Sequence, residues 1–142
     1  MSHSKVPQKN EVVSEEPKAK SVRPYTVVQK PFTAAELAFW GKSGIGENIL
    51  KAYRTVSLKK FSSENQERKP FSCMTSVDEP MFGYMGKQHI KVYRPCSQMR
   101  FLYVGDFGDN YCFGLEQLPA KGDLLFITGG EKDVMSLAAH GF

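Results

Sequence analysis

The chain has 142 residues, of which 41% are hydrophobic and 24% charged, a composition typical of a soluble globular protein with room for one modest domain. It contains no apolar run near the ~20 residues that span a bilayer and no apolar signal core, so we expect a cytoplasmic protein without a membrane partner. Three widely spaced cysteines without any C-x-x-C pair indicate reduced structural residues more than a disulfide or metal site.

The formal charge of +4 is unevenly distributed along the chain. Residues 1–70 carry 13 Lys and Arg against 7 Asp and Glu, whereas residues 71–142 carry 6 against 8. A basic first half and an acidic end fit a protein that holds an anionic polymer near a metal-binding centre. They also fit a solvated tail without any partner, so charge alone does not select a function.

The first predicted unit is a polar tail, residues 1–24. It is too poor in large apolar residues to offset the entropy of ordering, so we expect it to be disordered. Residues 25–32 are expected to be an extended lead-in, because Pro31 biases Lys30 away from helix.

Two short helices are predicted next. Thr33 and Glu36 have the spacing of a capping box, which predicts a helix that begins at Thr33 and ends near Gly44. Residues 46–53 form the second predicted helix, with their apolar side chains on one face. The pair superficially resembles a helix-turn-helix, so binding of duplex DNA is one alternative.

From Thr55 the hydrophobic pattern changes to the alternation of β-strands. Turn residues separate five predicted short strands, which are residues 55–61, 71–77, 81–85, 89–94 and 101–104. Their spacing is typical of an antiparallel meander. A single helical turn over residues 113–118 completes a second unit, residues 25–120.

The last predicted unit is residues 121–142. An apolar run over residues 123–128 predicts a buried strand, and Gly129 with Gly130 predicts a sharp turn. A helix is expected over residues 131–140, with an apolar face made by Val134, Leu137 and Ala138. The whole pattern predicts an α+β fold, in which two short helices and a small antiparallel sheet precede one parallel-type β-α unit.

Basic and aromatic residues are interleaved on the predicted strands. The cations are Lys87, Lys91, Arg94 and Arg100, and Tyr93 is one of the rings among them. Cations paired with phosphates and rings stacked on bases hold single-stranded nucleic acid, which makes these residues candidates for DNA binding. The alternative is an aromatic core whose outer face is solvated by Lys and Arg.

Glu131 and Asp133 stand in the first turn of the last helix. Mg²⁺ prefers oxygen ligands and bridges to substrate phosphates, so these carboxylates are candidate metal ligands and catalytic groups. The alternative is that they compensate the positive end of the helix dipole.

Four segments, taken in order, resemble one family. Residues 127–142, ITGGEKDVMSLAAHGF, resemble the opening β-α unit of the toprim domain in bacterial-type DNA primases and primase-helicases. Residues 36–58, 90–105 and 113–119 resemble the helix pair, the sheet and the connecting segment that precede this domain. The variety most similar is the primase-helicase of Bacteroides-like mobile elements.

The resemblance implies a nucleotidyltransferase that synthesises RNA primers on single-stranded DNA from ribonucleoside triphosphates. Mg²⁺ would be held by toprim carboxylates, and a helicase domain would act in cis or in trans. Two departures qualify it. Gly129 occupies the place of the family's catalytic Glu, so either the general base is missing or Glu131 takes over its role, and the family's later metal-binding strand would lie beyond Phe142.

We therefore expect the N-terminal part of a primase catalytic region, with a truncated toprim unit, that binds template and makes no primers alone. The alternative is a non-catalytic nucleic-acid-binding or accessory domain of a mobile element with a degenerate toprim unit.

Overall fold

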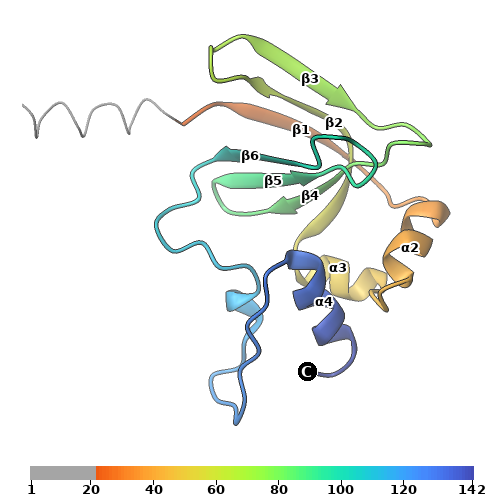
Figure 1. Ribbon diagram of the computed structural model, residues 1–142, viewed down its shortest axis with the longest axis vertical. Helices are drawn as coiled ribbons and strands as arrows, with labels where there is room; N and C mark the ends of the chain where they lie inside the picture. Colours follow the sequence, from red (N-terminus) through yellow and green to blue (C-terminus); the bar gives the residue numbers. More distant parts are fainter. Residues whose placement is uncertain (1–21) are drawn as a thin grey trace, which may run out of the picture.

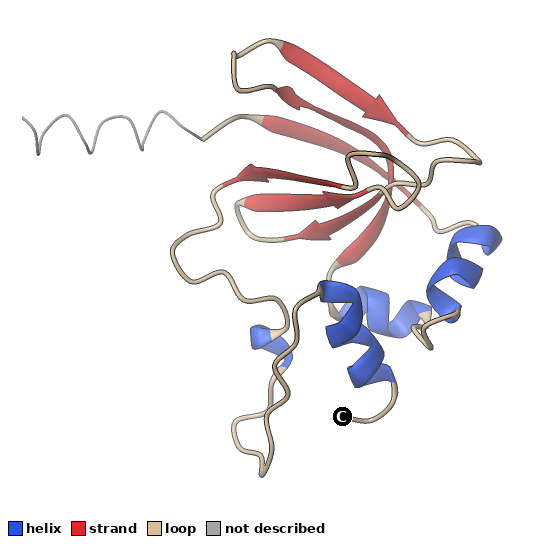
Figure 2. Cartoon of the chain, in the orientation of Figure 1, coloured by secondary structure: helices blue, strands red, loops and turns tan. Residues whose placement is uncertain are grey.

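The computed structural model describes residues 22–142 and shows a curved antiparallel sheet with helices gathered below it (Figure 1; Figure 2). The mixture of helices with an antiparallel sheet confirms the predicted α+β class. No helix in these residues has the length and apolar character required to cross a membrane. The elements in chain order are β1 (Tyr25–Lys30), α2 (Ala34–Gly41), α3 (Glu47–Ala52), β2 (Thr55–Glu64), β3 (Pro70–Met74), β4 (Phe82–Met85), β5 (His89–Tyr93), β6 (Phe101–Gly105), the 3-10 helix η2 (Leu115–Gln117) and α4 (Glu131–Ala139).

Strand β2 is the centre of the sheet, whose order is β1-β2-β4-β5-β6 with β3 also beside β2. One side of β2 pairs with β1, while its other side pairs first with β4 and then, further along, with β3. The predicted meander is therefore confirmed for β4, β5 and β6 but wrong for β3, because β4 returns to β2. A register shift between Val28 and Gln29 places an irregularity opposite β2, and such irregularities bend a sheet.

The curvature brings the start of β1 close to the end of β6. The Arg23 guanidinium donates hydrogen bonds to the carbonyl oxygens of Glu64 and Tyr103, at 3.0 and 3.3 Å. At the end of β6, Gly105 has a φ of +95°, and a Cβ at this position would lie 2.4 Å from the carbonyl oxygen of Gln88, so only glycine fits here. The predicted tail, residues 1–24, lies outside the described residues except for its last three, and Arg23 joins two strands of the sheet.

Two hydrophobic clusters occupy the two faces of the sheet. Because successive side chains of a strand point to opposite faces, Ile90 and Val92 of β5 belong to one cluster and Tyr93 to the other. The first cluster lies between the sheet and the helices and is centred on Trp40, Ile45, Leu50, Phe82, Tyr84, Tyr93 and Met135. The second fills the opposite face with Leu58, Phe61, Met81, Ile90, Val92 and Val104.

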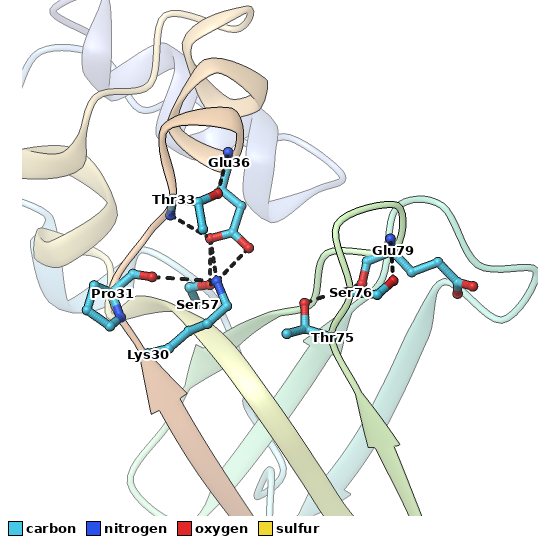
Figure 3. A network of polar contacts seen from close by, with 8 residues as sticks. All are labelled: Lys30, Pro31, Thr33, Glu36, Ser57, Thr75, Ser76 and Glu79. Atoms are coloured by element: carbon cyan, nitrogen blue, oxygen red, sulfur yellow. Dashed lines mark hydrogen bonds and ion pairs between the residues drawn. The ribbon is translucent and has the colours of Figure 1, made fainter.

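Helix α2 begins with the predicted capping box. The amide of Glu36 donates to the Thr33 hydroxyl at 3.1 Å, and the amide of Thr33 donates to the Glu36 carboxylate at 3.0 Å. The same carboxylate accepts hydrogen bonds from Lys30 at 2.7 and 2.8 Å and from the Ser57 hydroxyl at 2.8 Å (Figure 3). Glu36 therefore joins the helix start to β1 and β2 as well as capping it.

Replacing Glu36 with Gln is expected to lower the free energy of unfolding at pH 7 by about 2 kcal/mol, since it weakens the cap and leaves Lys30 unpaired. Burial acts to raise the pKa of Glu36, but the hydrogen bonds from Lys30, Thr33 and Ser57 and the charge of Lys30 lower it overall. A lowered carboxyl pKa stabilises the fold above the unfolded pKa, and this stability is lost as pH falls through the folded pKa.

Urea unfolding of the wild type between pH 7 and pH 3 is expected to show the loss at the acid end, below the ordinary carboxyl pKa of 4.5. Glu36→Gln should lose less stability over the same range, because it has no carboxyl to protonate. Glu47→Gln, at an exposed position in the first turn of α3, is the matched control and should follow the wild type. Identical pH profiles for Glu36→Gln and the wild type would contradict the assignment.

Residues 123–128 are not a strand, which corrects the prediction. They lie in a long loop before α4 that extends away from the sheet (Figure 1), and Leu125 and Ile127 are 60% and 88% exposed. An apolar run becomes a strand only when a neighbouring strand accepts and donates its backbone hydrogen bonds, and no described strand pairs with this one. Of the unit predicted over residues 121–142, the helix is present, and its toprim identity stays a prediction.

The glycine pair before α4 also differs from its prediction. Neither Gly129 nor Gly130 has a positive φ, so the backbone here requires no glycine. A Cβ on Gly129 would meet no atom within 4 Å, and one on Gly130 would make ordinary contact with Asp133 at 3.5 Å. A side chain is therefore sterically acceptable at the position where the resembling family has its Glu.

The inner face of α4 is centred on Glu131 and Met135, which are 8% and 0% exposed. The predicted apolar face, made by Val134, Leu137 and Ala138, is only half-buried beside it. The docking of α4 against the rest of the fold determines which of its faces is buried. The Ser136 hydroxyl donates a hydrogen bond to the carbonyl oxygen of Ser43 at 2.8 Å, which connects α4 to the turn after α2. Periodicity on a nine-residue helix could not resolve faces that differ by one position.

Candidate nucleic-acid interface

A row of aromatic rings, three of them exposed and one half-buried, follows the edge strand β6 into the next turn. We call Phe101, Tyr103, Phe107 and Tyr111 the aromatic row. Phe101, Tyr103 and Tyr111 are 36%, 52% and 37% exposed. The Tyr103 ring lies 5.8 Å from that of Phe107, which in turn lies 5.1 Å from that of Tyr111. Alternation along β6 places Phe101 and Tyr103 on the same face as Tyr93 and Lys91, their partners in β5.

Cations lie against these rings. The Arg100 guanidinium is 5.6 Å from the centre of the Phe101 ring, and the Lys91 ammonium is 4.5 and 5.0 Å from the rings of Phe101 and Tyr103. Such distances allow cation–π attraction. Arg100 is exposed and makes no ion pair within residues 22–142. Its charge is available to a phosphate.

The structure brings some of the five predicted DNA-binding residues together and separates others. Lys91, Tyr93 and Arg100 meet at β5 and β6, but Tyr93 is only 4% exposed and packs within the core between Tyr84 and Phe101. Arg94 lies 3.9 Å from Glu79, in a partly exposed ion pair. Lys87 is exposed in the turn between β4 and β5, at the other end of the row.

Lys91 is engaged by the first residue of α4. Its ammonium donates to both carboxylate oxygens of Glu131 at 2.8 Å, and the Tyr111 hydroxyl donates to the same carboxylate at 3.3 Å. The side chains of Lys91 and Glu131 are 11% and 8% exposed, so this is a buried ion pair. Burial, followed by the negative charge of Glu131, raises the pKa of the Tyr111 phenol and of the Tyr84 phenol, so both hydroxyls keep their protons at neutral pH.

Glu131 and Asp133 do not converge on one point. Residues two positions apart on a helix do not face each other, and here Glu131 is buried while Asp133 is exposed, 3.5 Å from the Thr128 hydroxyl. Both oxygens of Glu131 are bound to Lys91. The described residues contain no group of three His, Cys, Asp or Glu side chains placed to hold a metal ion. As arranged, the two carboxylates do not fit a shared Mg²⁺, and their metal role stays a prediction.

A pocket of about 430 Å³ opens where the aromatic row ends. Its wall is formed by the turn between β4 and β5 and by residues between Asp106 and Gln117, and Arg54 also lines it. Inside, the rings of His89 and Phe107 stack with centres 4.1 Å apart, and Tyr111 meets His89 edge-on at 5.1 Å. Burial lowers the pKa of His89 although Asp106 acts to raise it, which favours a neutral ring at pH 7.

Sequence reasoning missed three of these rings. Phe107, His89 and Tyr111 are not among the predicted site residues, and Phe107 and Tyr111 flank a run of turn residues that predicts only a loop. The available signal was a lone Phe among Gly, Asp and Asn, since a large apolar residue in such a turn needs a surface to cover it.

No protein-family model, curated protein or solved structure matches this chain.

Proposed function

We propose that this chain binds single-stranded DNA along the aromatic row, as the template-holding part of a toprim-type primase. The observation that carries the proposal is the row of exposed and half-buried rings with a cation at each end, Arg100 at one and Lys87 at the other, neither of which makes an ion pair within residues 22–142. Bases stack on exposed rings whatever their identity, at about 1–3 kcal/mol per base, and phosphates follow the cations. The row has this combination of chemistry.

The primase part of the proposal rests on the resemblance of four segments in their order along the chain. In that function the chain would work in the cytoplasm with Mg²⁺, ribonucleoside triphosphates and a helicase domain. Glu131 would have to leave Lys91 before it could serve as a base or a metal ligand, since both of its oxygens accept hydrogen bonds from that ammonium. Released in this way, Lys91 would add a third cation to the row.

A second candidate is a non-catalytic nucleic-acid-binding or accessory domain. The buried ion pair favours it, because a carboxylate held at 2.8 Å by an ammonium stabilises the position of α4 instead of performing chemistry. Both candidates share the same DNA-binding surface. They differ in the role of Glu131, which the effect of its removal on stability tests.

Replacing Lys87 and Arg100 together with Ala is expected to weaken binding to a fluorescein-labelled dT20 and to make it less sensitive to salt. Each phosphate contact contributes about 0.7 to the slope of log affinity against log salt, so two lost contacts reduce the slope by about 1.4. Fluorescence anisotropy between 25 and 200 mM NaCl (roughly the range in which counter-ion release dominates) measures both quantities. Tyr103→Ala should weaken binding roughly 5- to 100-fold and leave the slope unchanged.

The matched control is Lys59→Ala with Lys60→Ala. These two exposed lysines belong to β2, which β4 and β5 separate from β6, and their removal changes the net charge by the same amount. An equal loss of affinity in the control would reduce the effect to net charge. An absence of dT20 binding at the lowest salt would contradict the proposed function outright.

A further inference from the structure

The pocket at the end of the aromatic row has features of a binding site for one nucleotide. We propose that it takes a single unpaired nucleotide, with the base against the aromatic rings of the lining and one phosphate at Lys87 and Arg54, which also line the pocket. This inference rests on the proposed function and deepens it, because the pocket continues the row through Phe107.

The three aromatic rings in the pocket lining pack against one another. His89 and Phe107 lie nearly parallel, at an interplanar angle of 29°, and Tyr111 stands almost perpendicular to both, at 87° and 88°. The three rings line the pocket and offer a base stacked and edge-to-face contacts, the two arrangements that aromatic groups prefer. An aliphatic ligand would gain no such contact.

The backbone conformation beside these rings is constrained at Arg54 and at Gly86. Arg54 has a φ of +53°, in the left-handed region that residues other than glycine rarely adopt. Its guanidinium pairs with Glu116 at 3.1 Å, and its carbonyl oxygen accepts a hydrogen bond from the amide of Met85 at 3.0 Å. Strain of this kind concentrates at binding sites, where the surrounding structure enforces it. Gly86 is constrained differently: a Cβ there would lie 2.0 Å from Cε1 of His89. Any larger residue must displace the His89 ring.

Volume and charge limit the ligand to one nucleotide with one phosphate. A pocket of about 430 Å³ is near the lower end of the range for small-molecule sites, roughly 300–1,000 Å³. Lys87 and Arg54 are balanced by Asp106 and Glu116 in the lining. The balance disfavours a triphosphate, while the two carboxylates are acceptors for ribose hydroxyl and base amino groups.

Saturation-transfer-difference NMR with adenosine monophosphate tests the pocket. We expect saturation on the base protons, and little competition from inorganic tripolyphosphate, because stacking holds the ligand. Gly86→Ala, which moves the His89 ring, and Phe107→Leu, which keeps an apolar side chain without a ring, should each weaken binding at least fivefold. Gly129→Ala is the matched glycine control, since its Cβ meets no atom within 4 Å. Circular dichroism confirms that each variant is folded.

The nucleotide has two possible sources, and competition with labelled dT20 distinguishes them. Displacement of dT20 by the monophosphate means that a base of the bound strand enters the pocket, whereas simultaneous binding means that the pocket holds a free nucleotide. Either result supports the inference. It is overturned if dT20 binds normally but the monophosphate does not, or if Gly86→Ala and Phe107→Leu bind it as the wild type does. The proposed function survives those results and falls only if dT20 fails to bind.

Discussion

Glu131→Gln is expected to lower the free energy of unfolding by about 3 kcal/mol. It removes the charge that compensates Lys91, whose side chain is 11% exposed, and breaking a buried pair from one side costs about 3–5 kcal/mol. Tyr111 loses a charged acceptor at the same time. Urea unfolding followed by circular dichroism measures the change, provided that the slope with denaturant stays constant.

A double-mutant cycle separates the pair from its surroundings. Lys91→Met should cost about as much as the Glu131 substitution, whereas Lys91→Met with Glu131→Leu should recover most of the loss, because two apolar side chains need no counter-charge. Asp133→Asn is the control from the same helix turn, and its exposed position predicts a change within about 0.5 kcal/mol. Similar losses from Asp133→Asn and Glu131→Gln would contradict the structural role of the pair.

The outcome also bears on function. A carboxylate that serves as a base or metal ligand is commonly neutral or costly for stability, so its removal leaves the fold as stable as before or more so. A large loss on removal of Glu131 instead favours the accessory-domain candidate. Because Lys91 contacts the rings of Phe101 and Tyr103 as well as Glu131, the position of α4 is coupled to the shape of the aromatic row.

Trp40→Ala is expected to destabilise the protein by about 4 kcal/mol. The Trp40 side chain is fully buried between the helices and the sheet, with its ring centre 5.1 Å from that of Phe82 and 6.1 Å from that of Tyr93. Truncation leaves a cavity that the surrounding rings cannot fill, and losses of about 3–5 kcal/mol are usual for such changes. Thermal or urea unfolding measures the effect.

Trp40→Phe is the informative companion variant. The indole nitrogen of Trp40 is buried and has no hydrogen-bond partner among the described residues. Phe removes this unsatisfied donor while it keeps a ring, so we expect a loss of less than about 2 kcal/mol. If the Phe variant were as unstable as the Ala variant, the packing of an indole-sized ring, and not burial of an aromatic group, would dominate at this position.

The elements of the fold that depend on neighbouring residues were predictable from sequence. The capping box of α2 forms between Thr33 and Glu36, three positions apart, and it was predicted from that spacing alone. The strands β4, β5 and β6 lie near their predicted places, because alternation of apolar residues is a local property. The same alternation places Ile90 and Val92 on one face of β5 and Lys91 and Tyr93 on the other, as the structure shows.

Contacts between distant residues decided the rest. Lys91 is buried instead of solvated because Glu131, 40 positions away, is its partner, and no local pattern contains that information. Residues 123–128 have the composition of a strand, yet they remain a loop because strand formation needs a pairing partner that residues 22–142 do not provide. The pocket is likewise assembled from Arg54, Lys87 and Phe107, which belong to separate turns. Sequence by itself predicted Lys87, Lys91, Arg94, Arg100 and Tyr93 as candidates for nucleic-acid binding. The tertiary structure decided that Tyr93 is buried in the core and Lys91 against Glu131, and it added the rings of Phe107, His89 and Tyr111 to the candidate site.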